Sequence, residues 1–141
     1  MDFLIGVVLA LLAGISLTLL RMDRDRGVYP TILIVIALLY ELFAAMGGSP
    51  HALLVESIPA LIFIALAVAG FKSTLWFTVA GLALHGAWDF VHPIFIQNPG
   101  VPAFWPMFCS AYDVTAALYL GWLLSADRIA ASPADLASPL A

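Results

Sequence analysis

The chain has 141 residues, of which 64% are hydrophobic and only 10% are charged, whereas about a quarter of the residues in soluble domains are charged, so a soluble globular protein is excluded. Its length allows one domain, and its net charge of −4 includes only five Lys and Arg residues, with no basic patch that would support nucleic-acid binding. The composition is that of an integral membrane protein whose partner is the lipid bilayer, and the single cysteine excludes an internal disulfide.

Five apolar segments follow one another along the chain, each about as long as a helix that crosses the roughly 30 Å hydrocarbon core of a bilayer. Charged stretches or stretches rich in Gly and Pro separate them. The segments cover approximately residues 3–20, 30–46, 52–71, 75–92 and 106–124. We therefore predict an all-α fold, a single domain of five transmembrane helices over residues 1–125, followed by a flexible tail over residues 126–141.

The first segment carries small residues at four-residue spacing, namely Gly6, Ala10 and Gly14. Small residues in this register let two helix backbones approach closely in a membrane. This face is expected to pack either within the bundle or between copies of the chain, as in a homo-oligomer.

The basic residues all fall on one side of this five-helix arrangement. They are Arg21, Arg24, Arg26, Lys72 and Arg128. Because Lys and Arg are enriched on the cytoplasmic side of membrane proteins, we predict that the N-terminus lies outside and that the tail is cytoplasmic.

A polar stripe interrupts the fourth segment. His85, Asp89 and His92 are spaced so that a helix would hold them within an arc of roughly 60°. Ionisable groups at membrane depth are costly and by default face a protein interior or a wet cavity. This stripe is therefore the leading candidate for a functional site.

Three other segments contribute acidic residues at similar depth, namely Glu41, Glu56 and Asp113. By their distance from the segment ends, all of these groups lie near the midplane or in the outer half of the bilayer. The sequence thus predicts one polar pocket in the outer half, with Trp88 and Tyr112 as further lining residues.

The last two segments resemble a small bacterial family of multi-span membrane proteins. The resemblance rests on the sequence His85-Gly-Ala-Trp88-Asp89-Phe-Val-His92 and on a Cys-x-x-x-Asp element, here Cys109 and Asp113. It covers about 30 residues and implies that these side chains act as one group in a bacterial inner membrane. It implies nothing about a substrate, and Tyr112 stands where a second cysteine would be expected.

One interpretation of the pocket is an enzyme that acts on a lipophilic molecule. His85 would share general acid and base roles with Asp89, Asp113 or Glu41, and His92 and Glu56 would line the substrate. An isomerase, a hydrolase or a cyclase would fit this chemistry.

A second interpretation is a site for a divalent metal ion. His85 and Asp89, at i and i+4, form a chelating pair, and His92 and Asp113 are the further ligands in this interpretation, with Glu41 or Cys109 as alternatives. His85 and His92 lie about 10 Å apart along a helix axis. A single ion would therefore use only a subset of the stripe.

Other interpretations stay open at this point. The same groups could line a transport path or a proton relay, or belong to a non-catalytic subunit of a membrane complex. Each could also be structural: His85 hydrogen-bonded to Asp113, Glu41 protonated between helices, and Asp89 and His92 solvated at a helix end.

Overall fold

The computed structural model describes residues 1–137, and every regular element in that range is helical. The helices are α1 (Asp2–Leu19), the short 3₁₀ helix η1 (Met22–Arg24), α2 (Val28–Ala37), α3 (Leu39–Met46), α4 (Pro50–Lys72), α5 (Trp76–Phe95), α6 (Trp105–Ser125) and α7 (Pro133–Ala137). The end of the predicted tail, residues 138–141, lies outside the described residues.

Within the described residues, four helical stretches are long and apolar enough to cross a membrane. They are Asp2–Leu19, Val28–Met46 (α2 together with α3), Pro50–Lys72 and Trp105–Ser125. The prediction of an all-helical membrane protein is confirmed at this level. The fifth long helix, α5, has 20 residues, but His85, Asp89 and His92 lower its hydropathy.

The second predicted segment is not one continuous helix. The N–H of Leu38 bonds to the carbonyl of Val35 as well as to that of Ile34, which is the tighter 3₁₀ pattern that often ends an α-helix. The N–H of Leu42 then bonds to the carbonyl of Leu38. The chain therefore resumes as α3 within the same membrane-spanning stretch.

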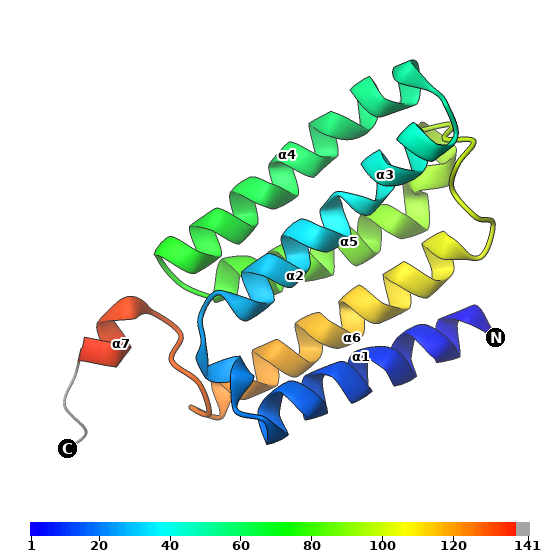
Figure 1. Cartoon of the computed structure of the whole chain (residues 1–141). Coiled ribbons are helices and arrows are strands. Elements are labelled where there is room, and N and C mark those ends of the chain that lie inside the picture. Colours follow the sequence, from blue (N-terminus) through cyan, green and yellow to red (C-terminus); the bar gives the residue numbers. More distant parts are fainter. Residues whose placement is uncertain (138–141) are drawn as a thin grey trace.

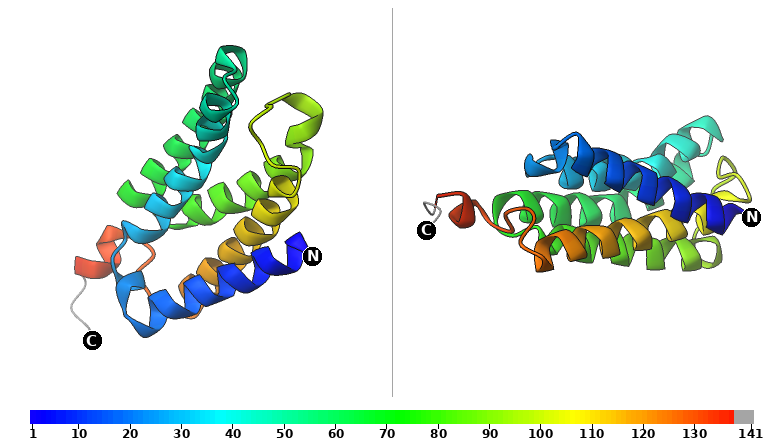
Figure 2. Two further views of the ribbon diagram at one scale, coloured as in Figure 1. Left: turned by 45° about the vertical axis from the view of Figure 1, so that its right-hand side comes forward. Right: turned by 90° about the horizontal axis from the view of Figure 1, so that it is seen from below.

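Helix α5 lies between two other long helices of the bundle. It packs between α6 and α4 and also contacts α2, while α1 covers α6, and α2 and α3 pack on α4 (Figure 1). The left view of Figure 2 shows α1 with α6 on one side of α5 and α3 with α4 on the other. The helix that carries the polar stripe thus packs against three other helices.

The distribution of side chains is inverted relative to a soluble protein. Large apolar residues face outward, such as Leu54 at 73% exposure and Ile94 at 77%. The polar residues of the bundle are turned inward. Glu56, His85, Asp89, His92 and Asp113 are all buried. Soluble monomers rarely expose so much contiguous apolar surface, whereas lipid solvates it.

The small residues of α1 pack within the chain. Gly6, Ala10 and Gly14 are its buried positions, and they face α6. A Cβ atom at Gly6 would collide with the carbonyl of Phe108, and one at Gly14 would lie 2.8 Å from the ring of Tyr119. This face therefore packs on α6 within the chain, which is the first of the two arrangements expected for it.

All five Lys and Arg residues lie at one end of the bundle, hereafter the basic end, at or next to the ends of α1, α2, α4 and α6. Arg26 donates to the carbonyls of Gly70 and Phe71 at the end of α4 and to that of Ala130. Ile129 is buried there. The start of the predicted tail is therefore packed on the bundle.

Candidate functional site

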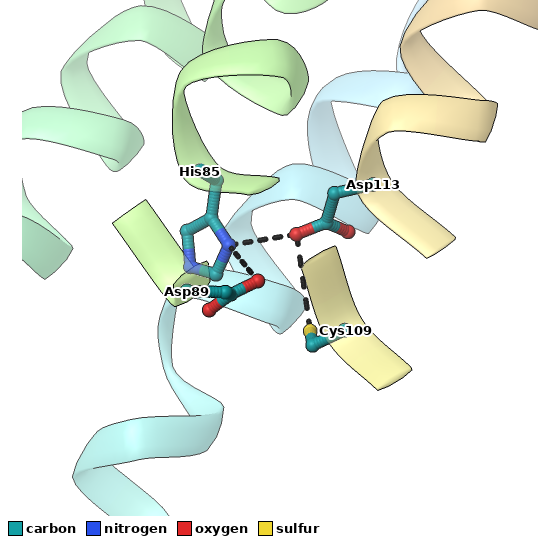
Figure 3. Close-up of side chains that lie close together, drawn as sticks. All are labelled: His85, Asp89, Cys109 and Asp113. Carbon is teal, nitrogen blue, oxygen red and sulfur yellow. Dashed lines mark hydrogen bonds and ion pairs between the residues drawn. The ribbon is translucent and has the colours of Figure 1, made fainter. Parts of the chain in front are cut away.

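Four side chains with metal-binding atoms meet between α5 and α6. They are His85 and Asp89 from α5, and Cys109 and Asp113 from α6 (Figure 3). One ligand atom from each lies within 4.8 Å of all the others, and all four residues are buried. We call this group the α5–α6 cluster. Each helix supplies residues at i and i+4, which share one face of a helix.

A glycine permits the two faces to approach. A Cβ atom at Gly86 would lie 2.9 Å from Cγ2 of Val114 and 3.0 Å from the carbonyl oxygen of Ser110. Any side chain at this position would push α6 away from α5. Gly86 directly follows His85, so this close contact sets the separation of the cluster's two halves.

His85 is the central residue of the cluster. Its Nδ1 lies 2.7 Å from Oδ2 of Asp113, in a hydrogen bond, and 3.3 Å from Oδ2 of Asp89. The thiol of Cys109 is 3.8 Å from Oδ2 of Asp113. The edge of the Phe63 ring packs on the imidazole, with ring centroids 4.6 Å apart.

The cluster contains two carboxylates but no Lys or Arg to offset them. Asp89 and Asp113 are both at 0% exposure. Three of their four carboxylate oxygens have no hydrogen-bond partner in the described part of the chain: both oxygens of Asp89, and Oδ1 of Asp113. Every Lys and Arg lies at the basic end. Because a buried ion costs several kcal/mol when it is uncompensated, this site favours a bound cation or protons.

His92 does not join the cluster, and pairs with Glu56 of α4. Nε2 of His92 lies 2.8 Å from Oε1 of Glu56, which also accepts a hydrogen bond of 2.9 Å from the side-chain amide of Asn98. Nδ1 of His92 and Oε2 of Glu56 are buried without a partner among the described residues. The predicted single pocket is thus divided into two groups.

Tyr40 of α3 lies between the two groups. Its ring stacks on His92 with centroids 4.0 Å apart and is 6.3 Å from the ring of His85. Its backbone carbonyl accepts a hydrogen bond from Asn98. The Tyr40 ring therefore lies between the Glu56–His92 pair and the cluster, and it contacts the imidazole of each group.

The other predicted residues lie around these groups. Glu41 is half-buried on α3 and belongs to neither group. The rings of Trp88 and His92 pack in a T-shaped arrangement, with their centroids 5.9 Å apart. Tyr112 faces an apolar cavity next to the cluster.

This cavity, hereafter the lateral cavity, has a volume of about 300 Å³ and lies between α2 and α6. Its lining includes Val35, Ile36, Leu39, Trp105, Cys109 and Tyr112. Cys109 therefore belongs both to the cluster and to the cavity wall.

Two residues of the site, Tyr40 and Asn98, were not predicted from the sequence. Cys109 was predicted only as an alternative metal ligand, on its place four positions before Asp113. Tyr40 and Asn98 had no such signal, because an aromatic residue in an apolar span and an amide in a Pro-rich connection are both common outside functional sites.

Comparisons with known proteins assign no family to this chain. It matches no protein-family model, no curated protein and no solved structure.

Proposed function

We propose that this protein is a membrane-embedded metalloprotein in which the α5–α6 cluster binds one divalent transition-metal ion. The observation that carries the proposal is the meeting of two i, i+4 pairs, His85 with Asp89 and Cys109 with Asp113, in a fully buried site. Helical bundles commonly build metal centres in this manner, from side chains on facing helices.

The donor set suits zinc better than magnesium or calcium. One imidazole, one thiol and two carboxylates supply nitrogen, sulfur and oxygen, whereas the hard cations prefer oxygen alone. Zinc bonds of roughly 2.0 to 2.3 Å place tetrahedral ligand atoms about 3.3 to 3.8 Å apart. The separations of 3.3 Å between His85 Nδ1 and Asp89 Oδ2 and of 3.8 Å between Cys109 Sγ and Asp113 Oδ2 are of this size. The 2.7 Å hydrogen bond between His85 and Asp113 would have to lengthen when an ion binds.

Charge supports the same proposal. With a neutral imidazole, the two carboxylates carry two negative charges, and Cys109 would add a third on losing its proton to the solvent as it binds. A divalent ion would offset two of these three charges where no Lys or Arg is near. A bound ion of this kind acts as a Lewis acid and lowers the pKa of coordinated water. The protein's own groups would hold and orient it, with His85 fixed by the packed ring of Phe63.

A second candidate function is acid and base catalysis on a lipophilic molecule without a metal. The 2.7 Å hydrogen bond between His85 and Asp113 favours it, because an imidazole held by a carboxylate is a common general base. In this case Asp89 would be the second proton carrier, and the reaction would be of the isomerase, hydrolase or cyclase type.

The proposed setting is a bacterial cytoplasmic membrane, with five spans, the N-terminus outside and the basic end in the cytoplasm. The gathering of all five Lys and Arg residues at one end supports this orientation. The length of α5, 20 residues, and the burial of its polar stripe support the fifth span.

The test is elemental analysis of protein purified without a metal-affinity tag and then incubated with Zn²⁺ and desalted. We expect about one metal ion per chain in the wild type and near-total loss in His85→Ala and Asp113→Asn. Glu41→Gln, an acid of the same bundle outside the cluster, is the matched control and keeps its metal. Equal metal content in all four proteins, or none in the wild type, would overturn the proposal. The absence of metal together with a co-purifying lipid would favour the second candidate.

A further inference from the structure

We infer that the lateral cavity binds the hydrocarbon chain of a single-chain lipid with a neutral oxygen-bearing end, such as a long-chain alcohol. Its polar end would lie beside Cys109 and the α5–α6 cluster. The identity of the polar end rests on the proposed function of the cluster, whereas binding of the chain rests on the cavity itself.

The cavity opens sideways, toward the acyl chains of a bilayer. Val35 lines it and is 55% exposed, whereas Ile36 and Cys109, which also line it, are 6% and 3% exposed. Val35 lies in the middle of the membrane-spanning stretch Val28–Met46. The opening is therefore at hydrocarbon depth and not at either end of the bundle.

The inner wall of the cavity leads to the cluster. Cys109 lines the cavity, and its thiol is 3.8 Å from Oδ2 of Asp113. A chain that fills the cavity thus places its end beside the thiol of Cys109, behind which the carboxylate of Asp113 lies. The cavity and the cluster are two parts of one site, with an apolar opening and a polar inner end.

The size of the lateral cavity and the charge of the cluster limit which lipid can bind. A volume of about 300 Å³ is at the lower limit of ligand pockets, which suits one chain better than the two chains of a phospholipid. An apolar wall alone would not favour this ligand over the acyl chains of the surrounding bilayer, because those chains are as apolar as leucine. Selectivity must therefore come from the polar end. The cluster carries two carboxylates without a metal ion, and with a divalent ion and the Cys109 thiolate it would keep one net negative charge, so in both states it would repel a carboxylate.

Quenching of Trp105 fluorescence measures this binding. Protein in phosphatidylcholine nanodiscs is titrated with 9,10-dibromooctadecanol. The fluorescence of Trp105 is obtained by subtracting the fluorescence of the Trp105→Phe variant from that of the wild type. We expect saturable quenching, weakened several-fold in Val35→Phe, which narrows the opening. Val68→Phe carries the same change on an exposed position of α4, where Val68 is 42% exposed, and is expected to leave the binding unchanged.

A second measurement uses the only cysteine of the chain. Octadecanol should slow the alkylation of Cys109 by N-dodecylmaleimide, as followed by intact mass, and should do so less in Val35→Phe.

Dibromostearic acid, with its carboxylate, is expected to quench Trp105 several-fold more weakly than the alcohol at equal concentration.

The outcomes separate this inference from the proposed metal centre. Asp113→Asn should lose the metal and keep saturable quenching, which supports both. Quenching that is linear with alcohol concentration, or the same in Val35→Phe and the wild type, would overturn the lipid site whatever the metal content. Saturable quenching in a wild type that binds no metal would support the lipid site and reject the metal centre.

Discussion

His85 and Asp113 are 28 positions apart in the chain, yet their side chains meet in a 2.7 Å hydrogen bond in the interior of the bundle. Both are excluded from solvent, at 1% and 0% exposure. Each is also the partner of a second potential ligand on its own helix, Asp89 for His85 and Cys109 for Asp113. The pair therefore joins the two halves of the cluster, and removing either member should affect both helices.

The first prediction concerns metal removal. A ligand at one hundred times its Kd stabilises the folded state by roughly 2.7 kcal/mol, so Zn²⁺ should raise the Tm of the wild type in detergent by several degrees. A chelator should reverse the change. In Asp113→Asn the two conditions should give nearly the same Tm, as followed by circular dichroism.

Glu41→Gln is the control for this experiment because it removes an acid that belongs to neither polar group. Its Tm should respond to Zn²⁺ as the wild type does. A response that persists in Asp113→Asn would place the metal elsewhere.

The second prediction tests the close approach of α5 and α6. Gly86→Ala inserts a methyl group 3.0 Å from the backbone carbonyl of Ser110, which cannot move without its helix. Overpacking of this kind costs about 1 to 3 kcal/mol. The variant should lose stability by this amount and bind Zn²⁺ more weakly, as measured by denaturant titration and elemental analysis.

Gly121→Ala provides the contrast. A Cβ atom there meets nothing closer than 3.8 Å, on Trp76 and Val79, so the helix should gain up to about 1 kcal/mol from the replacement of glycine. If both alanine variants are equally stable, the contact at Gly86 does not set the spacing of the helices.

The third prediction concerns the Glu56–His92 pair. Glu56→Ala removes the acceptor that the buried His92 shares with the half-buried Asn98. His92 is then left unsatisfied, and an unsatisfied buried group costs about 1 to 3 kcal/mol. The variant should unfold more easily but retain its metal, because His92 lies outside the cluster. A parallel loss of metal in Glu56→Ala and His92→Ala, measured on folded protein, would mean that the two groups act as one site.

Much of the fold follows from the sequence alone. Apolar length predicted each spanning stretch to within a few residues, because a helix must be long enough to cross the hydrocarbon core. Helical periodicity placed His85 and Asp89 on one face, and the depth of Asp113 put it at the same level as His85. These inferences need only the rise and turn of a helix.

The partners of each side chain could not be predicted in this manner. Which helices are neighbours, and how each is rotated, depends on packing such as the close contact at Gly86. Successive residues on a helix point roughly 100° apart, so a small rotation of α3 brings Tyr40 to the interior and leaves Glu41 half-buried. For the same reason His92 faces α4 and pairs with Glu56, while His85 faces α6.

The fourth prediction concerns the basic end of the bundle. Arg26 holds the segment after α6 by donating to the carbonyl of Ala130, 104 positions away, while it also donates to the last carbonyls of α4. Arg26→Gln should release this segment, because a neutral amide reaches fewer of these acceptors. Trypsin should then cut after Arg128 several-fold faster, as followed by the mass of the released C-terminal fragment.

The same digestion tests the orientation of the protein. With the basic end in the cytoplasm, Arg128 should be cut in inverted membrane vesicles and protected in intact spheroplasts. Arg21→Gln removes a cation from the same end and should leave the rate after Arg128 unchanged, since Arg26 and not charge in general holds the segment. Cleavage after Arg128 in intact spheroplasts would show the opposite orientation. Equal cleavage rates in Arg26→Gln and the wild type would show that the buried side chain of Ile129 suffices to hold the segment.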